Sequence, residues 1–349
     1  MSRPGRDIGL VRTGRGPGDN AEVADQTTLN RPARAGSRVQ AVALGALSLL
    51  ILVGAAVLDG IRAGAAGQTN AEFGSVTAAL GTIVVGCGCL ILARYPRHPV
   101  AVALLAFGFL WSIDGLLESW AALGASRPEP LPGTGFAFWF VDRIGAFLLV
   151  GLPVLLVLYP DGRLLGGVWR GISIAAIVMA CTLPVALTVM PISVVYLDGG
   201  LPPPVPEPSL PTIPVSDQVG FVILVVTRAM TFLALLPTLL VIFVRHRWAT
   251  GLQRTQLRWL LWAAIICAIL VAISLLVPTS LIAYIALFAA VIATSASIAA
   301  GICRPDLVDI DGLVAGTVVY AGVAGCVVIL DFAVLAATSG LLGDRLDQR

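Results

Sequence analysis

The sequence contains no lysine, only two histidines, and few charged residues of any kind. Charged residues make up 12% of the 349 positions, whereas 58% are hydrophobic. The 22 basic residues are all arginine, the formal net charge is only +2, and the arginines stand in short groups at the ends of apolar runs. Nucleic-acid binding requires a continuous basic face. We therefore expect no nucleic-acid partner.

Motifs for catalysis or metal binding are also absent from the sequence. No HExxH, GxSxG or GxxxxGKS/T pattern occurs. His98 and His246 each stand near arginine at the end of an apolar run, where interfacial packing is the favoured role. Cys87 and Cys89 form a C-x-C pattern with no histidine or second cysteine pair beside it, which favours apolar packing over a metal or redox site. We expect no catalytic residue, no metal and no cofactor.

Long apolar runs dominate what is present. A helix needs about 20 residues to span the hydrocarbon core of a bilayer, and nine segments meet that length. They are residues 39–58, 74–93, 99–122, 136–158, 169–195, 218–244, 257–277, 280–302 and 313–342. The stretch 257–302 must be two helices, because one helix of that length would reach about 69 Å, more than twice the thickness of the hydrocarbon core. The expected fold class is all-α, a polytopic membrane helical bundle with about nine transmembrane helices.

Prolines and glycines inside these segments predict local geometry. We expect kinks, not helix ends, where neighbouring helices can satisfy the carbonyls that a proline frees. The prolines concerned are Pro153, Pro184, Pro191 and Pro237. Gly81 and Gly88 are small residues that predict close approach between helices.

The arginines predict the orientation of the chain, since short cytoplasmic loops retain positive charge. With the N-terminus inside, sixteen arginines fall in inner segments and four in outer ones. We expect residues 1–38 to form a disordered cytoplasmic tail, 39–342 a transmembrane helical domain, and 343–349 a short extracytoplasmic tail. The loop around Arg254 and Arg258 then fixes topology, and a further role in coupling or in contact with anionic lipid headgroups stays open.

Charged residues inside spans are costly and are therefore candidates for function. They are Asp114, Glu118, Asp142, Arg143, Arg228 and Asp331. Asp114 and Glu118 share one helix face at a spacing of four, and all six are expected in the outer half of the membrane. Together they would suit a ligand or proton site. The alternative is structural, with Arg143 paired to Glu118 or Asp114 inside the bundle.

Four stretches that we expect on the cytoplasmic side match patterns seen together in other membrane proteins. They are ARYPRHPVAVALLAFG at 93–108, LYPDGRLLGGVWR at 158–170, TGLQRTQLRWLLWA at 250–263 and ICRPDLVDIDGLVAGTVVYA at 302–321. Taken in order, they resemble the membrane input region of actinobacterial-type sensor histidine kinases, which pair with helix-turn-helix response regulators. The resemblance implies a transmembrane sensor domain with cytoplasmic coupling turns. Those turns would contain Pro160, Asp161, Gly162, Arg163, Arg254, Gln256, Arg258, Trp259, Asp309 and Asp311.

The kinase part of that family has no counterpart in the sequence. We find no phosphoacceptor histidine motif and no ATP-binding pattern, so we expect no enzyme in the chain as given and interpret it as a truncated, split or stand-alone sensor. The candidate partners are the lipid bilayer, a second copy of the chain in a homodimer, and a separate kinase or response regulator. The alternatives are a secondary transporter, although nine spans do not divide into two equal repeats, and a degenerate protein without independent activity.

Overall fold

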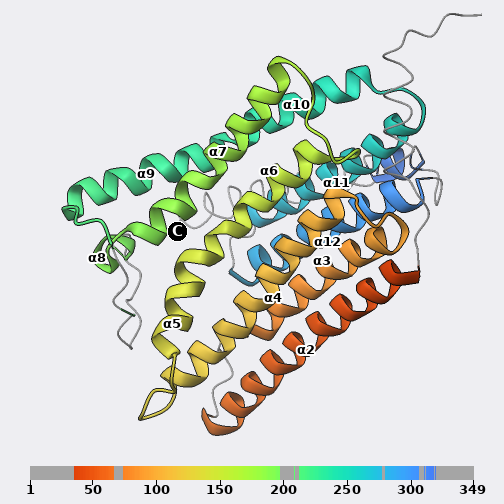
Figure 1. Cartoon of the computed structure of the whole chain (residues 1–349). Coiled ribbons are helices and arrows are strands. Elements are labelled where there is room, and N and C mark those ends of the chain that lie inside the picture. The colour runs from red at the N-terminus through yellow and green to blue at the C-terminus, as the bar shows by residue number, and fades with distance from the viewer. Residues whose placement is uncertain are drawn as a thin grey trace, which may run out of the picture.

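The computed structural model describes residues 35–66, 74–196, 208, 212–276, 280–305, 310, 312–317 and 319. Every regular element within these residues is helical, as the sequence predicts (Figure 1). The long elements are α2 (Ala35–Ala66), α3 (Gly74–Arg94), α4 (Pro99–Ala125), α6 (Leu148–Leu158), α7 (Val168–Val189), α9 (Asp217–Leu233), α10 (Leu235–Trp248), α11 (Gly251–Leu276) and α12 (Ser280–Cys303). The short ones are α5 (Thr134–Trp139), the π-helix η1 (Phe140–Ile144), the 3₁₀-helix η2 (Gly145–Phe147) and α8 (Ile192–Val195).

Helices α2, α3 and α4 form a tightly packed layer at one side of the bundle (Figure 1). A Cβ atom added at Gly81 would lie 2.4 Å from the backbone nitrogen of Ser112, so the α3 and α4 backbones are in direct contact there. Gly88 also faces α4, against Leu105. The predicted close approach at both glycines is confirmed. A hydroxyl of Ser48 in α2 donates to Thr82 in α3 at 2.9 Å and adds a polar link within this layer.

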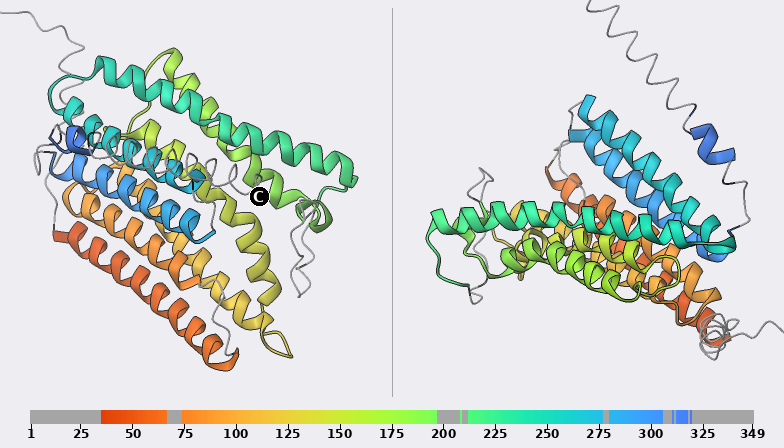
Figure 2. Two further views of the ribbon diagram at one scale, coloured as in Figure 1. Left: turned by 180° about the vertical axis from the view of Figure 1, so that it is seen from behind. Right: turned by 90° about the horizontal axis from the view of Figure 1, so that it is seen from above.

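The remaining helices pack around this layer. Helices α7 and α10 contact each other, and each of them also contacts α6 and α9. Helices α11 and α12 form an adjacent pair, and α12 packs against α3 (Figure 2). The largest buried apolar cluster includes side chains of α3, α4, α6, α11 and α12, among them Ile91, Leu104 and Ile298. The core therefore joins the N-terminal layer to the C-terminal pair.

Three of the four prolines lie inside helices, and the fourth lies between two helices. Pro153 and Pro184 lie inside α6 and α7, as expected. Pro237 lies in α10, and the boundary between α9 and α10 falls at Leu233–Leu235, where proline cannot donate a hydrogen bond to the carbonyl four residues earlier. The prediction for Pro191 is wrong, because α7 ends at Val189. The residue before this proline is extended, with ψ 148°, and α8 starts after it.

Seven stretches of the described residues are long and apolar enough to cross a membrane. They are Gly36–Gly64, Gly74–Arg94, Pro99–Ala125, Thr134–Leu158, Val168–Val189, Asp217–Trp248 and Ile285–Cys303. Residues 257–276 of the segment predicted at 257–277 lie in α11, which is not among the seven. Most of the segment predicted at 313–342 lies outside the described residues. The chain is a multi-pass membrane protein, while the count of nine spans and the orientation stay predictions.

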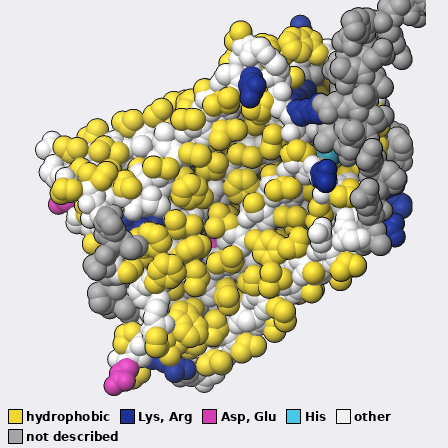
Figure 3. All heavy atoms as spheres, in the orientation of Figure 1, with side chains coloured by type: hydrophobic (Ala, Val, Ile, Leu, Met, Phe, Trp, Pro, Cys, Tyr) yellow, Lys and Arg dark blue, Asp and Glu magenta, His cyan; other side chains and the backbone are white. Residues whose placement is uncertain are grey.

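The surface agrees with a membrane environment. Large apolar side chains are exposed along the spans, such as Val42, Phe232 and Leu236. Figure 3 shows a face that is mostly hydrophobic, with arginines gathered mainly toward one end. We call the end of the bundle that holds His98, Tyr159 and Arg245 the inner end, following the predicted sidedness, and the opposite end the outer end.

Candidate functional site

A cavity of about 330 Å³ lies at the outer end, between α2, α4 and the α5–η1 segment. Its wall contains Arg62, Glu118, Ala121, Ala122, Phe138, Val141 and Asp142. Two carboxylates and one guanidinium thus share a wall with apolar side chains. We call this the outer cavity.

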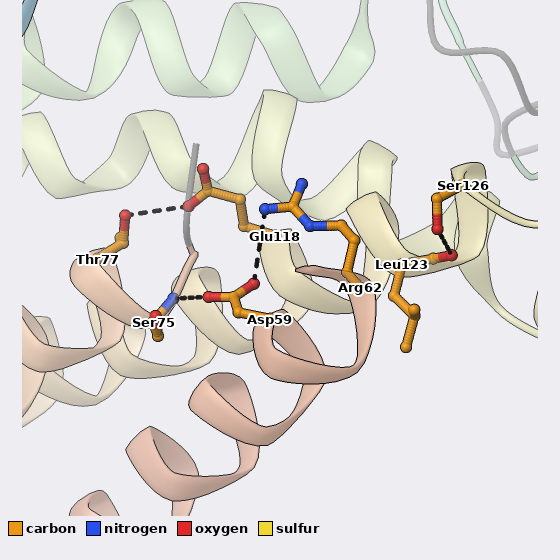
Figure 4. Close-up of polar contacts among 7 residues, drawn as sticks. All are labelled: Asp59, Arg62, Ser75, Thr77, Glu118, Leu123 and Ser126. Carbon is orange, nitrogen blue, oxygen red and sulfur yellow. Dashed lines mark hydrogen bonds and ion pairs between the residues drawn. The ribbon is translucent and has the colours of Figure 1, made fainter. Parts of the chain in front are cut away.

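The α2 side of the outer cavity is fixed by polar contacts near the start of α3 (Figure 4). The backbone N–H of Ser75 donates to Asp59 Oδ2 at 2.9 Å, so a carboxylate from α2 satisfies one of the first amides of α3. The other Asp59 oxygen lies 3.9 Å from the Arg62 guanidinium. Thr77 donates its hydroxyl to Glu118 Oε2 at 3.0 Å and holds that carboxylate from α3. These contacts position both charged groups at the cavity wall.

Asp114 lies one turn deeper than Glu118 on α4. Its side chain is only 7% exposed, and its Oδ1 atom has no hydrogen-bond partner within the described part of the chain. A Cβ atom added at Gly145 would lie 2.9 Å from Asp114 Oδ1, so glycine leaves the room that this carboxylate occupies. Asp114 is close enough to interact electrostatically with Glu118 and Asp142. The structure therefore brings these three predicted site residues together.

Asp142 and Arg143 face different neighbours. Asp142 lines the outer cavity and accepts a hydrogen bond from the Tyr196 hydroxyl. Arg143 is 1% exposed and donates to the carbonyls of Leu187, at 2.8 Å, and Met190. These carbonyls lie at the C-terminal end of α7, where cations are favoured because backbone acceptors lack intrahelical partners. Arg143 thus contacts the end of α7 and is not part of the cavity wall.

Arg228 is not brought to the cavity. Helix α9 turns Gly220, Leu224 and Thr231 inward, while Arg228 lies on an exposed face of the helix. The predicted layer of six charges therefore reduces, within the described residues, to Asp114, Glu118 and Asp142, with Arg62 as the cation in the wall. Asp331 lies outside the described residues.

At the inner end, the Tyr159–Arg163 turn is packed against the start of α4. A Cβ atom added at Gly162, which has φ +74°, would lie 2.5 Å from Pro99 Cδ, so both the conformation and the contact require glycine. The His98 side chain is buried and hydrogen-bonds to the Pro160 backbone. Burial lowers the pKa of His98, while Asp161 and the Pro160 backbone act in the opposite direction.

The same turn is held by α10 and α11. The buried Arg245 guanidinium donates to the carbonyls of Tyr159 and Arg163. The fully buried Tyr159 hydroxyl donates to the Gln256 carbonyl at 2.7 Å. Gln253 Nε2 donates to Asp161 Oδ2 at 3.2 Å. Gln256, a predicted coupling residue, therefore contributes through its backbone.

Helix α11 continues these contacts to the chain after α12. Trp259 Nε1 donates to the Pro305 carbonyl at 3.1 Å, and Trp262 Nε1 donates to Thr317 Oγ1 at 3.0 Å. The two indole rings also meet edge to face, with centroids 6.2 Å apart. Parts of residues 93–108, 158–170, 250–263 and 302–321 therefore form one connected set of contacts, which we call the inner cluster.

The other predicted coupling residues have varied positions. The Arg163 and Arg254 side chains are exposed at the inner end, and Arg258 is half-buried. Asp309 and Asp311 lie outside the described residues.

Sequence reasoning missed several residues at both ends. Asp59 and Arg62 were left out because they follow an apolar segment, although their spacing of three on one helix was a usable signal. Arg245 and Tyr159 were missed because a residue at the end of a span gives no sign of whether it turns inward.

Comparisons with protein-family models, with curated proteins and with solved structures find no match. What is established for this chain is therefore its class, that of an integral, multi-pass helical membrane protein.

Proposed function

We propose that the chain is the membrane input module of a signalling system, of the kind found in sensor histidine kinases. A stimulus at the outer cavity alters helix packing, and the inner cluster transmits the change to a cytoplasmic partner. The observation that carries the proposal is the inner cluster itself. Four stretches that are distant in the sequence, and that together resemble one family, are joined there by direct contacts.

Two helical spans support communication between the ends, because each contributes to both. Helix α4 starts at Pro99, which contacts Gly162, and carries Glu118 in the cavity wall roughly 29 Å away at 1.5 Å per residue. The span Thr134–Leu158 carries Asp142 in the wall and leads directly into Tyr159. A change in packing at the cavity would therefore act on both sides of the Tyr159–Arg163 turn.

The span Thr134–Leu158 also contains an element suited to change its state. A π-helix, Phe140–Ile144, is followed directly by a 3₁₀-helix, Gly145–Phe147. Such departures from α-helical geometry often mark functional hinges. Here they carry Asp142 at the cavity and Gly145 against Asp114. In the proposal, a change of charge near these carboxylates shifts the helical register and rotates α6.

The proposed receiver is a kinase or response regulator on the cytoplasmic side. The exposed side chains of Arg163 and Arg254 at the inner end would favour an acidic surface on that partner.

The experiment compares hydrogen exchange at the inner end in the full-length protein and in the variant Glu118→Gln, both in nanodiscs. The proposal expects altered exchange in peptides covering 158–170 and 250–263. Glu129→Gln is the matched control, because Glu129 is exposed on the loop after α4. Unchanged inner peptides in Glu118→Gln, with altered exchange confined to residues around the cavity, would refute coupling between the two ends.

A secondary transporter is the second candidate, favoured by the carboxylates that line the outer cavity. Proteoliposomes with and without an imposed proton gradient separate the two functions. Gradient-dependent uptake that Glu118→Gln abolishes would favour the transporter, and the sensor proposal expects none.

A further inference from the structure

The inner end of α10 combines an apolar stripe with an exposed arginine. Exposed side chains at spacings of four, three and four residues share one face of this helix, and they are Leu236, Leu240, Phe243 and Arg247. The Arg247 guanidinium lies over the Phe243 ring, 5.3 Å from its centre. Its positive charge is therefore placed directly beside apolar surface, as at the boundary between acyl chains and headgroups.

The start of α7 has the same arrangement. Arg170, Ile174 and Val178 are exposed at successive spacings of four residues, so they also share one helix face. Helix α7 begins at the inner end, and its arginine again stands at the inner end of an apolar stripe. Two neighbouring helices therefore present the same order of apolar and basic groups.

Two tryptophans join these stripes. Trp169 and Trp248, which are sequence neighbours of the two arginines, meet edge to face with ring centroids 6.3 Å apart. Trp248 is 64% exposed, and Trp169 is half-buried. The indoles of Trp120, Trp259 and Trp262 donate to acceptors in the protein, whereas neither ring of this pair donates to a described residue. An exposed indole with an available N–H is favoured at the membrane interface.

The segments around this pair are strongly basic. Residues 158–170 and 245–262 together contain six arginines and a single carboxylate, that of Asp161. Within the described residues, neither Arg170 nor Arg247 forms an ion pair. Basic groups beside a bilayer attract anionic headgroups, and guanidinium matches the geometry of phosphate.

The apolar stripes decide between a lipid and a soluble acidic partner. A soluble acidic surface would contact the arginines alone and would leave the apolar side chains below them unmatched. A phospholipid has acyl chains, an interfacial region and a phosphate in the same order as the apolar, indole and guanidinium groups on α7 and α10.

We propose that Trp169, Arg170, Arg247 and Trp248 form a binding site for an anionic phospholipid. The two guanidiniums bind its phosphate and anionic headgroup, the indole pair contacts the interfacial region, and the acyl chains lie along the apolar stripes of α7 and α10. This inference goes beyond the proposed signalling role and depends neither on that role nor on the orientation of the chain.

The test is native mass spectrometry of the full-length protein in a neutral detergent, titrated with dioleoyl phosphatidylglycerol. Dioleoyl phosphatidylcholine is the comparison, since it has the same acyl chains and no net charge. Saturable binding of phosphatidylglycerol is expected, with much weaker binding of phosphatidylcholine. Arg170→Gln and Arg247→Gln should each weaken phosphatidylglycerol binding about fivefold, and the double variant about thirtyfold. Trp248→Ala should weaken the binding of both lipids, because it removes apolar contact.

Matched variants separate a defined site from general attraction to arginine. Arg38→Gln removes an exposed arginine at the start of α2, which has no tryptophan beside it in the sequence, and should leave binding unchanged. The double variant Arg170→Lys with Arg247→Lys keeps both charges and should retain most of the affinity. It therefore separates loss of charge from loss of structure, and the helicity of each variant is checked by circular dichroism.

Two soluble competitors complete the test. Glycerol phosphate carries the headgroup chemistry without acyl chains, and polyglutamate represents a soluble acidic partner; neither should displace phosphatidylglycerol at concentrations where added phosphatidylglycerol does. Displacement by polyglutamate would favour an acidic protein surface and overturn the inference. Equal affinity for the two lipids, or an equal loss of binding in Arg38→Gln and Arg247→Gln, would also overturn it.

Discussion

The replacement Arg245→Met tests whether the inner cluster holds the bundle together. The Arg245 side chain is 7% exposed and donates to the carbonyls of Tyr159 and Arg163. Hydrogen bonds to a charged group contribute about 1.5–3 kcal/mol each, so about 3–6 kcal/mol of interaction is lost. Because methionine carries no charge that must be desolvated on folding, the substitution recovers part of this lost free energy. We expect a net destabilisation of about 2–4 kcal/mol.

The assay is unfolding in mixed micelles by added SDS, followed by circular dichroism. The matched control is Arg247→Met, two residues along the chain. Arg247 is exposed and lies over the Phe243 ring at 5.3 Å, a contact expected to contribute about 0.5–1 kcal/mol. Hydrogen exchange should also rise at the Tyr159–Arg163 turn in Arg245→Met and stay unchanged in Arg247→Met. Equal stability of the two variants would show that the geometry around Arg245 does not stabilise the fold.

The remaining predictions concern helix packing and pH. Gly81→Ala should cost about 1–3 kcal/mol in the same unfolding assay, because its Cβ would lie 2.4 Å from the Ser112 nitrogen, whereas Gly86→Ala, with no atom within 4 Å, should stabilise α3 slightly. Equal effects at the two glycines would contradict the close α3–α4 contact. Burial lowers the pKa of His98 in the folded state, so its contribution to stability is complete above about pH 6.5 and is lost as pH falls toward the folded pKa. His98→Asn should flatten the dependence of stability on pH between about pH 7 and pH 5. A pH dependence unchanged by His98→Asn would contradict this assignment.

The helices were predictable because their signal is local. Runs of about 20 apolar residues are sufficient to define spans such as α3 and α4, and the two-helix interpretation of 257–302 followed from length alone. The end of α7 before Pro191 was not predicted, because a proline inside an apolar run permits both a kink and a helix end. Tertiary contacts decide between them.

The candidate site was predictable only in part. A spacing of four residues indicated that Asp114 and Glu118 share a helix face, but not that Asp114 would be buried against Gly145 while Glu118 lines a cavity. The partner of Arg143 lies on α7, more than forty residues away in the sequence. No local pattern specifies that contact, nor the π-helix Phe140–Ile144 that contains both Asp142 and Arg143.

The most direct test of the account is the sidedness of its two ends. With the six native cysteines replaced by alanine, single cysteines at Glu129 and Arg254 are exposed to a membrane-impermeant maleimide in intact cells and again after permeabilisation. The account predicts that Glu129→Cys is labelled in intact cells and that Arg254→Cys is labelled only after permeabilisation. Labelling of Arg254→Cys in intact cells, with Glu129→Cys protected, would place the cavity inside the cell and contradict the proposed direction of signalling.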